Sequence, residues 1–170
     1  MTDSHTVTND FPPVYDEKSR ILILGSMPSE ASRAAGFYYM HPRNRFWRVM
    51  SALFGVDFSV LTAEEKAAAL NRRHVALYDV IRSCEIHRSS DASIRRVESA
   101  NIREMIEKSE INHIFLNGRT AYGLFLRHFS EYAAMATLLP STSPANAQVS
   151  LAALTEIWGA VILPRLELSN

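Results

Sequence analysis

The sequence predicts an α/β fold, a three-layer sandwich in which a central, mostly parallel four-stranded sheet carries helices on both faces. Four short apolar runs alternate with longer segments of helical periodicity, and this order is typical of strands joined by helical crossovers. The chain has 170 residues, of which 47% are hydrophobic, so it is long enough for one domain with a sizeable core. We therefore expect residues 1–13 to form a flexible tail and residues 14–170 to form a single domain.

The four apolar runs are the predicted strands. The first, at residues 20–25, is apolar without interruption until it reaches Gly25, which is typical of a strand buried in a parallel sheet. The other three strands are expected at residues 74–81, 111–118 and 135–139. Because parallel sheets bind ligands at the carboxyl ends of their strands, the segments that follow these runs are the candidates for a functional site.

Helical periodicity fills the stretches between the apolar runs. Hydrophobic residues recur there at spacings of three and four, as on the buried face of a helix. The expected helices span residues 45–54, 63–71, 93–108, 119–128 and 148–161, with Pro164 after the last of them.

The composition excludes several classes of protein. Cys84 is the only cysteine, so the chain holds no internal disulfide, thiolate zinc site or cysteine-held iron–sulfur cluster, and we expect neither a metal nor a cofactor. No apolar run reaches the ~20 residues of a membrane span. The first ten residues are polar and lack the features of a signal peptide. We expect a cytoplasmic protein, in a bacterial-type cytosol or nucleoid, that does not bind membranes.

The net charge is zero, with 18 basic and 18 acidic residues. This balance argues against DNA binding, because proteins that neutralise phosphates usually carry a basic excess. The distribution is uneven, however, and four arginines crowd one part of the sequence: Arg33, Arg43, Arg45 and Arg48. A solvated helix face explains these arginines as well as a nucleic-acid contact does, so charge alone does not decide between them.

Residues 36–47 form the most unusual segment, because they combine several aromatic residues with a histidine, an asparagine and two arginines. The aromatic pair at 46–47 is expected to pack into the core at the start of a helix that Asn44 caps. Tyr39 lies in the preceding loop, close to Arg43. Aromatic rings beside basic residues suit a stacked base next to a phosphate.

Two further segments follow predicted strands. Residues 25–29, Gly-Ser-Met-Pro-Ser, form a turn in which glycine and proline redirect the chain, and such a turn is a weak signal on its own. Residues 140–146, Pro-Ser-Thr-Ser-Pro-Ala-Asn, are small, polar and stiffened by two prolines. Their hydroxyl and backbone N–H groups suit phosphate oxygens, although a capped loop before the last helix explains the composition equally well.

Taken together, these segments resemble the uracil-DNA glycosylase superfamily. Residues 25–28 and the His-Pro-x-Asn-x-Phe-Trp of residues 41–47 resemble its first motif region, especially that of the mismatch-specific uracil/thymine-DNA glycosylases. Residues 141–146 resemble its second motif, and residues 115–122 resemble its third strand and the helix that follows. The resemblance extends over about residues 20–160.

Two departures from the superfamily pattern favour one branch of it. Most members orient the attacking water with an Asp or Asn before the first-motif proline, but here that residue is Met27, whose thioether is a poor acceptor. The second-motif position usually held by His or Asn is Ser141. The combination resembles the hypoxanthine-DNA glycosylase (DNA-deoxyinosine glycosylase) family, which removes deaminated adenine. That resemblance implies that Asn44 is the catalytic residue.

The resemblance implies a monofunctional DNA glycosylase that flips a deaminated base, hypoxanthine in preference, out of double-stranded DNA and hydrolyses its N-glycosidic bond. No obligate protein partner is expected. Asn44 would position the water and Tyr39 would stack on the base. Asn117 would contact the base edge or serve only as a structural residue at a strand end. The other expected pocket residues are Gly25, Ser26, Met27, Pro28 and Ser29. The expected DNA-binding residues are Arg43, Ser141, Thr142, Ser143, Pro144, Ala145 and Asn146. We expect Asp79 and Asp91 to cap turns.

Three other interpretations stay open at this point. The first is a uracil or thymine mismatch glycosylase of the same superfamily. The second is a catalytically silent relative that binds nucleic acid or nucleotides, which Met27 and the zero net charge favour. The third, a small-molecule α/β hydrolase, lacks both a Gly-x-Ser-x-Gly elbow and a glycine-rich phosphate loop.

Overall fold

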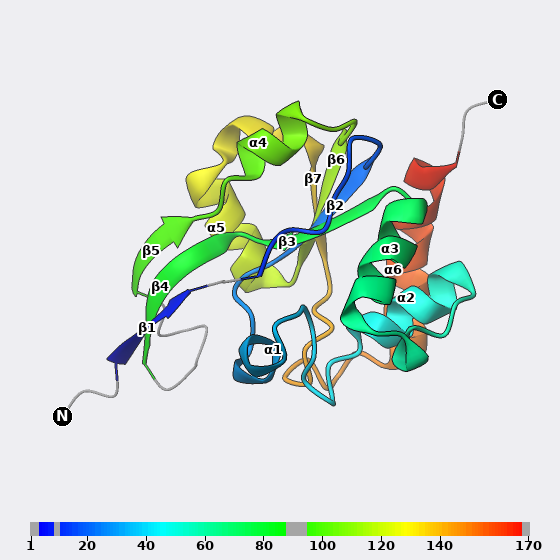
Figure 1. The fold of residues 1–170 in the computed structure, drawn as a ribbon, viewed down its shortest axis with the longest axis horizontal. Coiled ribbons are helices and arrows are strands. Elements are labelled where there is room, and N and C mark those ends of the chain that lie inside the picture. The colour runs from blue at the N-terminus through cyan, green and yellow to red at the C-terminus, as the bar shows by residue number, and fades with distance from the viewer. Residues whose placement is uncertain (1–3, 9–10, 88–94, 168–170) are drawn as a thin grey trace.

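A four-stranded parallel sheet forms the centre of the computed structural model, which describes residues 4–8, 11–87 and 95–167 (Figure 1). The order of its strands is β3-β2-β6-β7, and each neighbouring pair is parallel. The strands are β2 (Ile21–Gly25), β3 (Val75–Asp79), β6 (His113–Asn117) and β7 (Ala136–Leu139). All four predicted strands are therefore present.

Strand β2 lies between β3 and β6 inside the sheet, and all of its residues are buried. Its side chains alternate between two separate hydrophobic cores, as the twofold repeat of a strand requires. Ile21 and Ile23 belong to one core, and Leu22 and Leu24 belong to the other. The continuous apolar run of the sequence thus reflects burial on both faces of the sheet.

Helices cover both faces, which confirms the predicted three-layer arrangement (Figure 1). One core is closed by α2 (Phe46–Phe54), α3 (Ala63–Arg72) and α6 (Leu151–Leu166). The other core is closed by α4 (Ile102–Glu107) and α5 (Arg119–His128). Three short elements complete the main body: α1 (Glu30–Ala35), η1 (Phe58–Val60) and η3 (Ser130–Met135).

A second, antiparallel sheet was not predicted. It contains β1 (Ser4–Thr8), β4 (Ile81–His87) and β5 (Arg95–Ser99) in the order β1-β4-β5. The expected flexible tail therefore differs from the structure, because residues 4–8 pair with β4 and Phe11 is buried in a hydrophobic core. The strand depends on a partner about 80 residues away, so its polar local sequence carries no signal for it. The extent of a single domain over residues 14–170 stays a prediction.

The predicted helix over residues 93–108 is correct only in its second half. Residues 95–99 form β5, and the helix begins at Ile102 after Asn101, whose side chain accepts a hydrogen bond from the backbone N–H of Glu104. Pairing with β4 across the second sheet overrides the helical spacing of the apolar residues here.

The last helix is shifted along the chain relative to the prediction. It begins at Leu151, because the hydroxyl of Ser150 accepts from the backbone N–H of Ala153 at 3.1 Å and so caps the helix. It continues through Pro164 to Leu166. A proline this close to the end of a helix removes one backbone donor and leaves little helix to disrupt.

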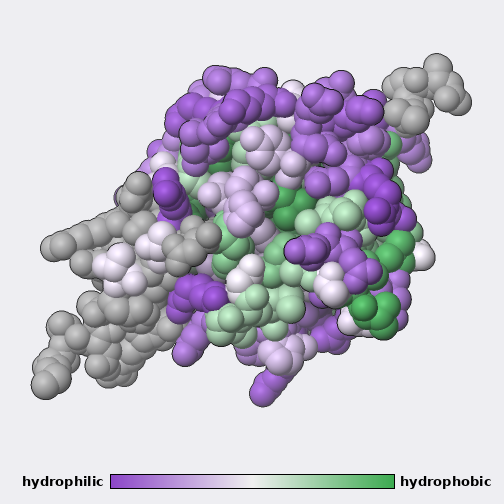
Figure 2. Space-filling view, in the orientation of Figure 1, coloured by the Kyte–Doolittle hydropathy of each residue, from purple (hydrophilic) through white to green (hydrophobic). Residues whose placement is uncertain are grey.

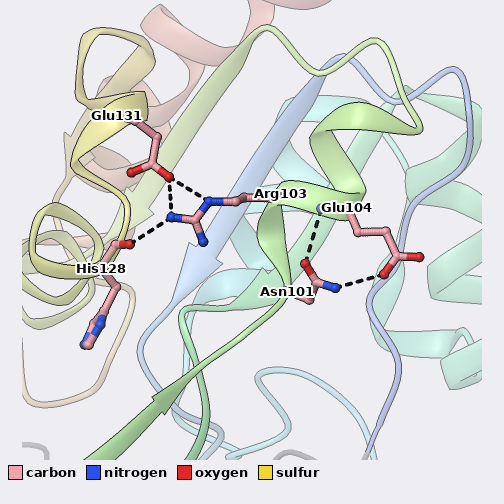
Figure 3. A network of polar contacts seen from close by, with 5 residues as sticks. All are labelled: Asn101, Arg103, Glu104, His128 and Glu131. Atoms are coloured by element: carbon pink, nitrogen blue, oxygen red, sulfur yellow. Dashed lines mark hydrogen bonds and ion pairs between the residues drawn. The ribbon is translucent and has the colours of Figure 1, made fainter.

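Polar contacts tie α4 to the segment that follows α5 (Figure 3). Arg103 forms an ion pair with Glu131, and its guanidinium also donates to the backbone carbonyl of His128 at 3.4 Å. Hydrophilic side chains cover the surface over α4 (Figure 2). Among the helices that the structure describes, none combines the length and the apolar character that a membrane crossing requires.

Candidate active site

Three chemically distinct residues end neighbouring strands of the central sheet. Gly25 is paired in register with Asp79, and Asn117, at the end of β6, lies on the other side of β2. Since the strands are parallel, their carboxyl ends meet at one edge, where a parallel sheet binds ligands. The polar loops after these strands therefore converge at the same place.

A cavity of about 1000 Å³ opens at this edge of the sheet. Its walls come from the turn after β2, the entrance to α2 and the loop after β7. The predicted site residues that line it are Gly25, Ser26, Met27, Pro28, Ser29, Tyr39, Asn44, Asn117, Ser141, Thr142, Ser143, Ala145 and Asn146. Arg43 and Pro144 do not line the cavity. The structure thus brings together segments that lie more than 100 residues apart in the sequence.

A directed chain of hydrogen bonds joins two amides through one hydroxyl. The backbone N–H of Thr142 donates to Oδ1 of Asn117 at 3.0 Å, and Nδ2 of Asn117 donates to the hydroxyl of Thr142 at 3.0 Å. That hydroxyl donates to Oδ1 of Asn44 at 2.8 Å, and the backbone N–H of Phe46 donates to the same oxygen at 2.9 Å. Both lone pairs of Oδ1 of Asn44 are therefore used, which leaves the N–H groups of Nδ2 as the donors that this amide can offer to the cavity it lines.

Thr142 occupies a different place from the one expected for a residue that contacts the DNA backbone. Its side chain is 0% exposed, and its hydroxyl lies between Asn117 and Asn44. A buried hydroxyl whose single hydrogen is already donated to Asn44 has no hydrogen left to donate to a phosphate oxygen. The neighbouring hydroxyls of Ser141 and Ser143 each accept a backbone hydrogen bond within the loop and keep their O–H as a donor.

Arg45 holds the loop after β7, residues 140–149, against the start of α2. Its guanidinium donates to the carbonyls of Ser143 at 3.1 Å and Asn146 at 2.9 Å, and also to that of Val149. Its backbone N–H donates to the carbonyl of Thr142 at 3.0 Å. The sequence showed Arg45 only as one of four clustered arginines, so this role was missed. Its partners lie about 100 residues away, and no local signal identifies them.

Tyr39 forms part of the cavity wall and is packed on one side. Its ring stacks on that of Phe46, with 4.1 Å between the ring centroids and 23° between the planes. Its hydroxyl is buried without a well-formed hydrogen bond. Burial raises the pKa of Tyr39, the negative charge of Asp79 raises it further, and the nearby amide of Asn117 opposes the shift. The phenol therefore stays protonated at neutral pH.

Asp79 lies at the wall of the cavity, where sequence reasoning had favoured a turn cap. Its side chain is 3% exposed, and its carboxylate sits beside the hydroxyl of Tyr39 over the backbone of Gly25.

His41 accepts a hydrogen bond at Nδ1 from the backbone N–H of Arg43 at 3.1 Å and so stabilises a turn. Asp91 lies outside the described residues. Across the described part of the chain, no three His, Cys, Asp or Glu residues come together to hold a metal.

Comparison with known families decides the class of protein. The family model described as the Uracil DNA glycosylase superfamily matches residues 12–161. The chain belongs to the uracil DNA glycosylase superfamily. The predicted fold class and the predicted DNA glycosylase activity are confirmed at this level, and a DNA substrate follows from the family.

Two curated relatives and one solved structure resemble this glycosylase. A hypoxanthine DNA glycosylase of Methanosarcina acetivorans is 34% identical over 160 residues, covering 91% of this chain and 98% of the relative. One of Methanosarcina barkeri is 38% identical over 88 residues, covering 52% of this chain and 56% of the relative, so that match spans about half of each protein. The solution NMR structure of a proposed uracil DNA glycosylase from Methanosarcina acetivorans has a TM-score of 0.77 at 32% identity, covering 92% of this chain and 97% of that one.

Gly25→Ala tests the close packing at the inner end of this glycosylase's cavity. A β-carbon there would lie 2.7 Å from Oδ1 of Asp79 and 2.8 Å from the hydroxyl oxygen of Tyr39, so both side chains must move. We expect base excision to fall about tenfold or more, with a loss of unfolding free energy of about 1–3 kcal/mol. Single-turnover excision and thermal unfolding measure the two effects.

Gly123→Ala is the matched control for this substitution. Gly123 lies within α5, and a β-carbon there would meet no atom within 4 Å. The change should stabilise the protein by about 0.5–1 kcal/mol, because alanine favours the helix, and should leave excision unchanged. Normal excision by Gly25→Ala would show that the positions of Asp79 and Tyr39 do not matter to the reaction.

Proposed function

We propose that this glycosylase removes deaminated bases, hypoxanthine in preference, from double-stranded DNA by hydrolysing the N-glycosidic bond and leaving an abasic site. The observation that supports it most is the amide of Asn44. Its orientation is fixed by two hydrogen bonds to Oδ1, and its side chain lines a cavity large enough for a flipped nucleotide. The curated relatives named hypoxanthine DNA glycosylase support the choice of base.

In the proposed reaction, water attacks the sugar carbon C1′ while the bond from C1′ to N9 of the base breaks. The bonding electrons leave with the purine, and the sugar becomes oxocarbenium-like in between. The Nδ2 hydrogens of Asn44 hold the water below the sugar. A neutral amide does not accept the proton, so Asn44 contributes position and polarity. One proton of the water passes to solvent and the departing purine takes up one, which leaves neutral hypoxanthine and an abasic sugar.

The chemistry of the cavity wall also suits hypoxanthine better than adenine. Hypoxanthine carries a hydrogen on N1, whereas adenine presents a lone pair there. The carboxylate of Asp79 is an acceptor, so it favours a base with a donor at that edge and repels one with a lone pair. The ring of Tyr39 provides a stacking surface, and the second Nδ2 hydrogen of Asn117 is a donor for O6 or N7 of the base.

The loop after β7 is the proposed contact with the DNA backbone on either side of the flipped nucleotide. The O–H groups of Ser141 and Ser143 are donors for phosphate oxygens, and the exposed Arg43 adds a positive charge outside the cavity. Ala145 is exposed where the superfamily resemblance implies an apolar wedge that enters the duplex. Its short side chain would fill little of the space that the flipped base leaves.

A panel of lesions tests this proposal directly. Single-turnover excision is measured on duplexes that differ only in one base: deoxyinosine, deoxyuridine, a G·T mismatch, and undamaged adenine. We expect the fastest cleavage with deoxyinosine and none with adenine. Faster release of uracil or mismatched thymine would favour a mismatch-specific glycosylase instead. Tight binding to an abasic-site duplex without release of any base would favour a silent relative.

A further inference from the structure

We propose that Thr142 is a positioning residue for catalysis, which orients the Asn44 amide from within the protein and couples it to Asn117 on the base side of the cavity. This inference rests on the proposed function, because Asn44 must act in the reaction for its orientation to matter. Thr142 acts through Asn44 in this proposal, since the residue is 0% exposed and its hydroxyl already accepts from Asn117 and donates to Asn44.

A backbone N–H fixes the direction of each hydrogen bond in the series that runs from Asn117 through Thr142 to Asn44. The N–H of Thr142 can only donate, so the atom of Asn117 that faces it is the carbonyl oxygen Oδ1. Nδ2 of Asn117 therefore faces the hydroxyl of Thr142 as a donor. The hydroxyl then has its single hydrogen for Asn44, and the atom it meets is Oδ1.

The backbone N–H of Phe46 reaches the same oxygen of Asn44 from the other side. Two donors that converge on Oδ1 leave one orientation of the amide, with Nδ2 toward the cavity. Donors on the carbonyl oxygen also polarise the amide and strengthen its N–H groups as donors. Without the Thr142 hydroxyl, the amide is held only through Phe46 and can rotate about that bond.

The hydroxyl can be removed without removing the other anchors of Thr142. Its backbone N–H stays bonded to Asn117, and its carbonyl stays bonded to the N–H of Arg45. Valine has nearly the same shape as threonine and lacks the hydroxyl, so Thr142→Val deletes the two side-chain bonds alone. Thr142→Ser deletes a methyl group and keeps both bonds.

The test compares Thr142→Val, Thr142→Ser, Asn44→Ala and the double variant Asn44→Ala/Thr142→Val. Single-turnover excision of hypoxanthine at saturating enzyme and binding to an abasic-site duplex are measured for each. We expect Thr142→Val to lower the rate about ten- to hundredfold with DNA binding nearly unchanged. Thr142→Ser should remain within about threefold of wild type. In the Asn44→Ala background, Thr142→Val should add almost nothing, because the group on which it acts is gone.

Thr137→Val is the matched control. Thr137 lies on β7, and its hydroxyl makes a 2.7 Å hydrogen bond with Nε2 of the buried His113. The substitution removes a hydroxyl hydrogen bond without touching the cavity lining. It should lower the thermal midpoint as Thr142→Val does and leave the excision rate unchanged.

Three results would overturn the positioning role. They are a wild-type rate for Thr142→Val, equal losses for Thr142→Val and Thr142→Ser, or the same factor of loss from Thr142→Val with and without Asn44. If Thr142→Val does not fold, Thr142→Ala and Thr142→Ser are compared at a temperature where both are folded, with the same expected contrast. A wild-type protein that releases no base would contradict the proposed function itself, which is a distinguishable outcome.

Discussion

Asn44→Ala is expected to lower the single-turnover rate of base excision about a hundredfold or more, which is the typical cost of removing one group that holds a reacting species. The substitution removes the side-chain amide that is proposed to hold the water beneath the sugar. It also leaves the N–H of Phe46 and the hydroxyl of Thr142 without their shared acceptor. A loss of about 1–2 kcal/mol in unfolding free energy should therefore accompany the loss of rate.

Asn101→Ala separates these two effects. Asn101 accepts from the N–H of Glu104 at the start of α4, so it is also an asparagine whose side chain accepts a backbone N–H at the start of a helix, but it does not line the cavity. We expect a comparable loss of stability and an unchanged rate of excision. Near-normal excision by Asn44→Ala, at a temperature where the variant is folded, would refute the assignment of Asn44 as the residue that holds the water.

Arg45→Ala is expected to cause the largest loss of stability among these substitutions, because one side chain joins three carbonyls of the loop after β7. Hydrogen bonds from a charged donor contribute about 1.5–3 kcal/mol each, but these carbonyls are partly accessible to water, so we expect a total loss of about 3 kcal/mol. For a chain of this length, that corresponds to a decrease of roughly 6–12 °C in the thermal midpoint. Excision should fall about tenfold or more, because Thr142 and its neighbours are no longer held against Asn44.

Arg48→Ala is the control for the loss of a positive charge. Arg48 lies in the first turn of α2, is exposed, and makes one long hydrogen bond of 3.4 Å to the carbonyl of Pro42. We expect its unfolding free energy to stay within about 0.5 kcal/mol of wild type and its excision rate to be unchanged. If Arg45→Ala behaves in the same way, the loop is held by its own internal hydrogen bonds and not by the arginine.

The sequence determined those elements whose signal is local. Strand β2 is a continuous apolar run, and that pattern alone identifies a strand covered on both faces. Helix α5 has the predicted bounds of residues 119–128, since its apolar spacing and its flanking glycine lie within the segment itself. The motif segments at residues 25–29, 41–47 and 140–146 likewise gave the composition of the site and its family.

Tertiary structure alone decided which of these groups touch. Strands β1 and β5 exist only because β4 pairs with both, and several of the hydrogen bonds that organise the site join residues 98 or more positions apart, as that between Thr142 and Asn44 does. Contacts over such separations depend on how the loops close over the sheet, and no local pattern encodes that geometry. The sequence therefore determined what chemistry lies at the end of the sheet. The fold decided that a buried threonine directs the amide and that Arg45 holds the loop around it.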